Sequence, residues 1–519
     1  MFAQSQPSKR PIAGYARLRL RQPLAACIIV ALGLSQAKCT AFAESLVESP
    51  RRPNIVVILA DDLGYGDAKC YNSAAKVPMP NIDRLATEGM RFTDAHSGSA
   101  VCTPTRYGLL TGRYAWRTRL QRGVFYGYEP PLIDADRLTL PKMLKQHGYH
   151  TACIGKWHLG WDWPKSDRNE QPDFTKQIAG GPTTRGFDTY FGTHVPNQAP
   201  YCFIDQDRII GSPTETKAVD PVMISGRAGP MVPGWKFEEI LPTITRRAVQ
   251  YVDDRAKTDE PFFLYFPLTT PHEPISPSPA FRGKSGINPV ADLMMETDWA
   301  VGQVLEAIER NKLADDTLVV FTADNGHATY TGLPALLEAG HQPSGPLQGY
   351  KTDIHEGGHR VMFIARKPGL IRAGTTCDAT ICHTSILPTC AELLGVKLPE
   401  TASEDGASIL PLLKGETPER PVFEAVVHHA ANGQFAVRQG QWKLIFPGVP
   451  KGEKSPPSKI ALYDLVADLG ETTNVAAANP EIVAELTKLM ERYVAEGRST
   501  PGAKQANDVA VDIWKKSQL

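Results

Sequence analysis

The sequence predicts an α/β fold with a mostly parallel sheet flanked by helices, followed by a smaller C-terminal α+β domain. Short apolar, β-branched runs alternate with segments of amphipathic helical spacing, which is typical of an α/β domain. After about residue 421 the pattern changes to short segments typical of an antiparallel sheet. With 519 residues, the chain is long enough to bury a large core and to form both parts.

Four apolar runs are predicted as buried strands, at residues 54–60, 150–154, 261–266 and 317–323. Helical spacing is found over 240–256, where apolar side chains fall on one face, and again around 294–308. Residues 196–234 and 326–349 are rich in Gly and Pro, so we expect long surface loops there, near the mouth of a site.

The C-terminal part is predicted to span residues 421–519, after a main domain of residues 44–420. Its expected elements are two short extended segments and one helix, at 435–446, 461–465 and 480–496. We expect the extended segments to pair as an antiparallel sheet that packs on the main domain.

The N-terminal residues 1–43 are predicted to be a signal peptide. Four arginines precede the apolar run 24–34, and Ala41-Phe42-Ala43 matches a cleavage site for export. The run is too short to span a bilayer comfortably, and no later segment approaches about 20 apolar residues. An alternative in which Cys39 carries a lipid is weaker, because Lys38 stands where a small residue is expected. The mature protein is therefore expected in the periplasm or outside the cell, without a stable membrane span.

Charge and cysteine content narrow the function further. The chain has 56 Lys and Arg and 56 Asp and Glu, which argues against a general attraction to nucleic acid. Seven cysteines remain after the signal peptide, and none forms a CxxC zinc pattern. If some of them pair in an oxidising compartment, one is left over, and we expect it to be Cys102.

Polar clusters follow the four predicted strands. Asp61-Asp62 follows the first, GKWHLG (155–160) the second, TPHEP (270–274) the third and DNG (324–326) the fourth. Ligands of open α/β sheets bind at the carboxyl ends of the strands, so we expect these clusters to form a single active centre.

The residue types in these clusters suit a hard metal ion and an anionic substrate. Asp61, Asp62, Asp324 and Asn325 offer oxygen ligands, which Ca²⁺ or Mg²⁺ prefers to sulfur or nitrogen. Either pair alone would more often cap a helix or form a turn. Lys156, His158, His272 and Lys351 add positive or proton-donating groups. A divalent metal with such groups suits an ester of a tetrahedral oxyanion, because catalysis there is mostly positioning and charge stabilisation.

The motif CTPTR (102–106), followed by LTGR (110–113), resembles the signature of the type I sulfatases, formylglycine-dependent and arylsulfatase-like members of the alkaline phosphatase superfamily. The resemblance extends over nearly the whole mature chain, through VVILADDLGYGD (56–67), GKWHLG, TPHEP, FTADNG, GYKTDIHEGGHR (349–360) and LYDL (462–465).

The resemblance implies the alkaline-phosphatase-like fold and a set of site residues. A formylglycine-generating enzyme would oxidise Cys102 to formylglycine during maturation, and the bound ion would be Ca²⁺ rather than Mg²⁺. The implied metal ligands are Asp61, Asp62, Asp324, Asn325 and the modified Cys102. The implied sulfate and catalytic contacts are Arg106, Lys156, His158, His272 and Lys351.

The implied chemistry explains an unpaired cysteine in an exported chain. The hydrated aldehyde is a gem-diol; one hydroxyl attacks sulfur and expels the alcohol, and the second lets the aldehyde re-form and release sulfate, with His158 as base. Three residues depart from the family pattern: Thr105 replaces the usual serine, and His355 and Met362 replace an expected aromatic residue and proline.

The expected function is hydrolysis of sulfate monoesters of a sulfated carbohydrate, with aryl sulfates as artificial substrates. One alternative is a phosphate or phosphonate ester hydrolase of the same fold; Cys102 favours a sulfatase, because phosphate-specific relatives generally use Ser or Thr. Another is a non-catalytic protein that binds sulfated glycans. His428, His429 and the 326–349 loop are candidates to line the leaving-group pocket.

Overall fold

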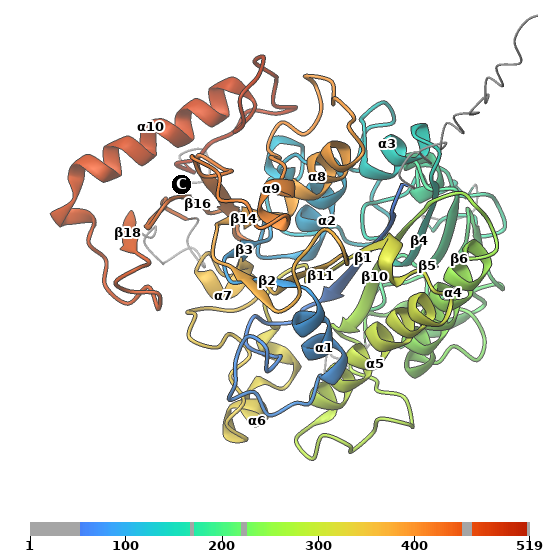
Figure 1. Cartoon of the computed structure of the whole chain (residues 1–519). Helices are drawn as coiled ribbons and strands as arrows, with labels where there is room; N and C mark the ends of the chain where they lie inside the picture. Colours follow the sequence, from blue (N-terminus) through green and yellow to red (C-terminus); the bar gives the residue numbers. More distant parts are fainter. Residues whose placement is uncertain (1–51, 167–170, 219–225, 449–458, 516–519) are drawn as a thin grey trace, which may run out of the picture. The chain divides into compact units, whose positions relative to one another are not determined.

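The computed structural model describes residues 52–166, 171–218, 226–448 and 459–515. The predicted fold class is confirmed: a large, mostly parallel sheet lies between helices, and a smaller antiparallel sheet follows it in the chain (Figure 1). The predicted signal peptide lies outside the described residues. Within the described residues, no helix has the length and apolar character needed to cross a membrane.

The main sheet has ten strands among the described residues. In their order across the sheet they are β13 (Thr375–Cys377), β2 (Met90–Phe92), β12 (Phe363–Arg366), β11 (Thr317–Ala323), β1 (Asn54–Asp61), β10 (Phe262–Pro271), β4 (His150–Lys156), β5 (Thr189–Thr193), β6 (Ile204–Asp205) and β7 (Arg208–Ile209). The central strands β11, β1, β10, β4 and β5 are parallel to one another, so their carboxyl ends share one edge.

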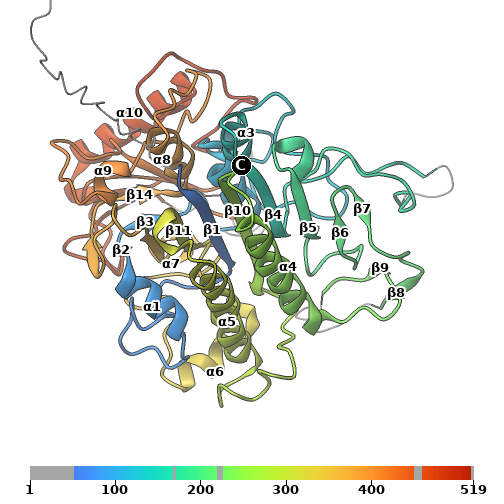
Figure 2. The ribbon, with the colours of Figure 1, turned by 45° about the vertical axis from the view of Figure 1, so that its right-hand side comes forward.

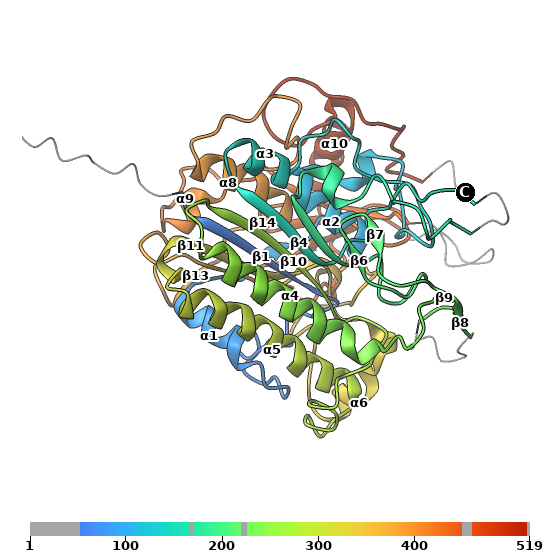
Figure 3. The same cartoon turned by 90° about the vertical axis from the view of Figure 1, so that its right-hand side faces the viewer.

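Helices cover both faces of this sheet, which is why its central strands read as continuous apolar runs. Successive side chains of β1 alternate between two cores. Val56, Ile58 and Ala60 pack with α1 (Pro80–Glu88), α4 (Ile240–Arg255) and α5 (Pro289–Arg310), which lie together on one face in Figures 2 and 3. The alternate residues of β1 pack with α2 (Cys102–Thr111), α3 (Leu140–Gln146) and α8 (Ile386–Leu393) on the other face.

The predicted strands and helices are present, with differences at some ends. β10 continues through Pro271, beyond the predicted end at residue 266. α5 begins at Pro289, earlier than predicted, where the Asn288 side chain accepts a hydrogen bond from the Ala291 amide at 2.9 Å. The two predicted loops contain short elements, namely α6 (Leu333–Glu338), β6, β7, β8 (Glu215–Lys217) and β9 (Gly229–Met231).

The C-terminal sheet is antiparallel, in the order β15 (Val426–His429), β16 (Phe435–Gln439), β17 (Trp442–Ile445) and β18 (Ala461–Asp464). Its helix α10 (Pro480–Glu496) buries Leu486 and Met490 against this sheet. The predicted domain boundary at residue 421 stays a prediction. The remaining elements are β3 (Ala95–His96), β14 (Ile381–Cys382), α7 (Glu356–His359) and α9 (Leu410–Leu413).

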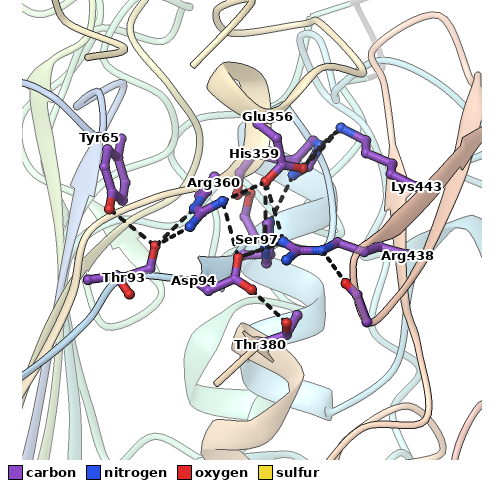
Figure 4. A network of polar contacts seen from close by, with 12 residues as sticks. Tyr65, Thr93, Asp94, Ser97, Glu356, His359, Arg360, Thr380, Arg438 and Lys443 are labelled. Carbon is purple, nitrogen blue, oxygen red and sulfur yellow. Dashed lines mark hydrogen bonds and ion pairs between the residues drawn. The ribbon is translucent and has the colours of Figure 1, made fainter. Parts of the chain in front are cut away.

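A buried charge cluster joins the C-terminal sheet to the main domain (Figure 4). Lys443 of β17 contacts Glu356 of α7 at 3.0 Å, and Arg438 of β16 contacts Asp94 at 2.6 Å. Its members are three carboxylates and three cations, Asp94, Glu356, Glu471, Arg360, Arg438 and Lys443, which we call the clamp. Burial alone would raise the pKa of Glu356, but Lys443 and its other positive neighbours bring that pKa well below its ordinary value. The clamp is therefore charge-balanced, and each member depends on its partners.

We expect Lys443→Met to lower the free energy of unfolding by about 3–5 kcal/mol, because it leaves the Glu356 and Glu471 carboxylates buried without their shared cation. Denaturant unfolding measures this. The matched control is Arg492→Met, which removes a half-exposed ion pair with Glu424 and should cost about 1 kcal/mol or less. Equal stability of the two variants would contradict a structural role for the clamp.

Candidate active site

The carboxyl ends of the parallel strands bring the predicted site residues together. β1 ends at Asp61, β4 at Lys156, and β11 is followed directly by Asp324. Carboxylate oxygens of Asp61, Asp62 and Asp324 lie within 4.8 Å of one another. Cys102, the first residue of α2, places its sulfur within 4.8 Å of ligand atoms of Asp61 and His272. The structure thus brings the polar residues predicted after the strands together at this edge of the sheet.

The backbone of the site takes conformations that few side chains adopt. Asp62 and His158 have φ of 69° and 55°, in the left-handed region. Residues in this conformation cluster at functional sites, because the surrounding structure must hold them there. Gly326 is required for close approach, since a Cβ there would lie 1.9 Å from the carbonyl oxygen of Gly357. This contact packs the turn after β11 against the turn that carries Glu356.

Each carboxylate in the site lies within 2.7 Å of one cation, and Asp61 also lies 3.5 Å from Arg106 Nη2. The pairs are Lys156 Nζ with Asp61 at 2.7 Å, Arg106 Nη2 with Asp324 at 2.7 Å, and Lys351 Nζ with Asp62 at 2.6 Å. The Asn325 amide also donates to Asp62 Oδ1 at 2.7 Å. All of these side chains are buried, so the three negative and three positive charges compensate one another away from solvent.

The oxygen atoms of the site fit a hard metal ion. Asp61 Oδ1 and Asn325 Oδ1 are buried and have no hydrogen-bond partner among the described residues. Burial and the neighbouring Asp61 carboxylate raise the pKa of Asp324 to about 7, although Arg106 and Lys156 act in the opposite direction. A divalent cation would satisfy both oxygens and stabilise the ionised carboxylates. With oxygen donors in the majority, the set suits Ca²⁺ or Mg²⁺.

Each of the two predicted histidines is anchored through one of its own ring nitrogens. His158 Nε2 lies 3.0 Å from the Phe125 carbonyl oxygen, and its Nδ1 has no partner among the described residues. His272 Nδ1 lies 2.6 Å from the Glu273 carbonyl oxygen, which leaves Nε2 toward Asp62 Oδ2 at 3.9 Å. Burial brings the pKa of His158 well below its ordinary value and that of His272 to about 4, so both rings are neutral near pH 7.

Cys102 is a poor nucleophile as a thiol. Burial raises its pKa to about 11, so the reactive thiolate is scarce at neutral pH. It is a free thiol, as are the other six cysteines of the described chain.

Three further side chains contact the site and were missed in the sequence. The Glu273 carboxylate accepts hydrogen bonds from Tyr330 at 3.0 Å and from Asn197 at 2.7 Å. The Tyr330 hydroxyl also lies 3.4 Å from Lys351 Nζ. Glu273 stands inside the TPHEP motif, and Asn197 and Tyr330 lie in the two Gly- and Pro-rich segments predicted as loops near the mouth of the site, but none of the three was singled out.

The structure corrects the prediction that His428 lines a leaving-group pocket, because this ring packs on His359 and His96; for His429 the prediction stays a prediction. His428 is fully buried and stacks on His359, with ring centroids 3.8 Å apart, and His429 is 2% exposed. Both lie on β15, whose alternating side chains are buried in this sheet. Met362, one of the departures from the family pattern, is also a fully buried core residue.

The chain is similar to known proteins along most of its length. Residues 53–396 match the Sulfatase family, and residues 350–498 match the family described as N-sulphoglucosamine sulphohydrolase, C-terminal. N-acetylgalactosamine-6-O-sulfatase of Bacteroides thetaiotaomicron is 34% identical over 489 residues, covering 86% of this chain and 93% of that protein. Human arylsulfatase A is 32% identical over 473 residues, covering 85% and 87%. A solved sulfatase structure described with glycosaminoglycan metabolism in B. thetaiotaomicron has a TM-score of 0.75 at 32% identity, covering 85% of this chain and 99% of that one.

The α/β sheet and the buried charged site at its carboxyl edge define a hydrolase that acts on an ester of a tetrahedral oxyanion. The chain belongs to the sulfatase family, whose members are sulfuric ester hydrolases. The resemblance found in the sequence is thus confirmed at the level of family and fold.

Proposed function

We propose that this sulfatase hydrolyses a sulfate monoester of a carbohydrate, with aryl sulfates as artificial substrates. The supporting observation is Cys102, placed at the start of α2 beside Asp61 and His272, in a site with three carboxylates and three cations. The relatives named for N-acetylgalactosamine 6-sulfate support a saccharide substrate. We also propose that the protein is exported to the periplasm or beyond. A saccharide substrate and the apolar run 24–34 both support this.

The proposed metal ligands are Asp61, Asp62, Asp324, Asn325 and the modified residue 102, and the proposed ion is Ca²⁺. When bound, the ion supplies positive charge that withdraws electrons from sulfate oxygens. The chain supplies the rest of the charge. Lys156, Lys351 and Arg106 each lie within 2.7 Å of a ligand carboxylate, so they are positioned to pair with an arriving sulfate ester as well.

The proposed nucleophile is a formylglycine, made from Cys102 by a formylglycine-generating enzyme during maturation. Its hydrate carries two hydroxyl groups on one carbon. One hydroxyl gives its proton to a neighbouring carboxylate, and its oxygen bonds to sulfur as the bond between sulfur and the alcohol oxygen breaks. The other hydroxyl then loses its proton, the aldehyde re-forms, and sulfate leaves. A cysteine thiol or a serine hydroxyl lacks the second hydroxyl group and therefore lacks this route for releasing sulfate.

Three nitrogen groups are proposed for the proton transfers, one as base and two at the leaving oxygen. Neutral His158, anchored through Nε2, offers the unpaired Nδ1 as base for release of sulfate. Lys351 remains protonated, because Asp62 and other neighbours outweigh burial and bring its pKa well above the ordinary value. Lys351 and His272 are the groups proposed at the leaving oxygen.

A screen of the modified protein tests the proposed substrate class. Sulfated saccharides and aryl sulfates are compared with phosphate and phosphonate esters of the same alcohols. Turnover of the sulfates in preference to their phosphate counterparts supports the proposal. Preference for phosphate or phosphonate would favour the alternative hydrolase, and tight glycan binding without turnover would favour a binding protein.

Lys351→Ala is expected to lower kcat/KM more on a sugar sulfate than on nitrophenyl sulfate, with a loss of about 10²-fold or more on the sugar. A nitrophenolate leaves as a stabilised anion, whereas a sugar alkoxide depends on proton donation. His272→Ala is measured in the same assays, to determine which of the two residues donates the proton to the leaving oxygen. Equal losses on both substrates in both variants, at unchanged metal and formylglycine content, would show that neither residue is the acid.

A further inference from the structure

Three side chains beside the reaction centre have no part in the proposed chemistry: Tyr330, Glu273 and Asn197. We propose that they form the subsite for the sugar ring that carries the sulfate, and that this sugar bears no negative charge other than that ester. The inference rests on the proposed function and adds the class of sugar to it.

The position of these residues follows from their contacts with the proposed acids. Lys351 Nζ lies 2.6 Å from Asp62 Oδ2 and 3.4 Å from the Tyr330 hydroxyl. His272 Nδ1 lies 3.2 Å from Glu273 Oε2. Atoms bonded to an oxygen that leaves between Lys351 and His272 therefore emerge next to Tyr330 and Glu273. For a sulfated saccharide, those atoms belong to the sugar ring.

Tyr330 offers a fixed, accessible aromatic ring. Its hydroxyl donates to Glu273 at 3.0 Å and contacts the buried Lys351, yet 50% of the residue is exposed. An aromatic ring whose hydroxyl is already held presents an apolar surface, and little further side-chain entropy is lost when a ligand binds to it. The apolar C–H face of a sugar ring is a matching surface.

Asn197 offers a hydrogen-bond acceptor that lacks a donor. Its Nδ2 must face the Glu273 carboxylate, to which it donates at 2.7 Å, and this fixes the orientation of the amide. Asn197 Oδ1 then has no partner among the described residues, although the side chain is only 7% exposed. A buried acceptor of this kind calls for a donor, and a sugar hydroxyl or amide N–H supplies one.

The Glu273 carboxylate determines which charge on the sugar the subsite accepts. Its carboxylate is 7% exposed and is held by neutral donors, Tyr330 and Asn197. A carboxylate or a second sulfate on the same sugar would face this negative charge in a poorly solvated place and be disfavoured. The geometry therefore selects a neutral hexose or N-acetylhexosamine as the carrier of the ester.

The experiment compares kcat/KM on three esters: an N-acetylhexosamine monosulfate, the same sugar with a second sulfate, and ethyl sulfate. Ethyl sulfate has an alkoxide leaving group but no sugar ring. We expect Tyr330→Ala to lower kcat/KM on the monosulfated sugar at least about tenfold more than on ethyl sulfate, mainly through KM. Glu273→Gln should raise acceptance of the disulfated sugar relative to the monosulfated one. The control is Tyr126→Ala, which removes a tyrosine that is 53% exposed and contacts Arg227.

The failures can be told apart. Turnover of the monosulfated sugar with the same selectivity in Tyr330→Ala, Tyr126→Ala and the wild type would overturn the subsite and leave the proposed function standing. Turnover of nitrophenyl sulfate without turnover of any saccharide sulfate would overturn the carbohydrate function and the subsite together.

Discussion

Cys102→Ala is expected to lower kcat/KM by at least about 10³-fold on every sulfate ester, because it removes the proposed nucleophile from an otherwise intact site. Cys102→Ser should be nearly as inactive, and after incubation with substrate it should carry a sulfate ester on residue 102. The serine hydroxyl can attack sulfur, but it has no second hydroxyl with which to release the product.

A second cysteine serves as the control for this loss. Cys153 is also fully buried and lies on β4 in the same main domain. Cys153→Ala should keep its activity within about threefold, since it removes only core packing. Full activity of Cys102→Ala, or an equal loss in Cys153→Ala, would contradict the assignment of residue 102 as nucleophile.

Asp324→Ala is expected to reduce bound calcium and to lower activity by at least about 10²-fold. The variant removes one of three carboxylates whose oxygens lie within 4.8 Å of one another, and it leaves Arg106 without its partner at 2.7 Å. Chelation of the wild-type enzyme should give a comparable loss that calcium restores. Elemental analysis and activity are measured on the same samples.

The matched variant is Asp298→Asn, because Asp298 is a buried carboxylate outside the site. It accepts hydrogen bonds from the amides of Asn81 and Ile82 at the start of α1. This change should lower stability without altering metal content. Stoichiometric zinc in active wild-type enzyme, or full calcium occupancy in Asp324→Ala, would contradict the proposed metal site.

The convergence of the site could be predicted from sequence because it follows from one rule of parallel sheets. The apolar runs identify β1, β4, β10 and β11 as strands of one parallel sheet, and the polar residues at or just after their carboxyl ends must then meet at one edge. Asp61, Lys156, His272 and Asp324 were found in this way. Cys102 starts a helix rather than following one of these strands, so its place depended on the family resemblance.

On the substrate side of the site, the sequence pointed to the 326–349 loop, which contains Tyr330, but the individual residues could not be predicted in the same way. Tyr330 lies on a short turn, and Asn197 lies in a segment rich in Gly and Pro, so neither has a periodic pattern to fix its direction. His428 shows the opposite error: a pair of histidines suggested a site, but alternation along β15 and tertiary packing bury it against His359. The clamp was missed as well, since its carboxylates and cations come from segments far apart in the chain.

The most direct test of the account is the chemical state of residue 102 in active enzyme. Trypsin releases the peptide of residues 92–106, and conversion to formylglycine replaces the sulfur and two hydrogens of the side chain by one oxygen, which mass spectrometry resolves. The account predicts that activity rises in proportion to the converted fraction when a formylglycine-generating enzyme is co-expressed. Full activity in a preparation whose residue 102 is entirely the unmodified thiol would contradict it.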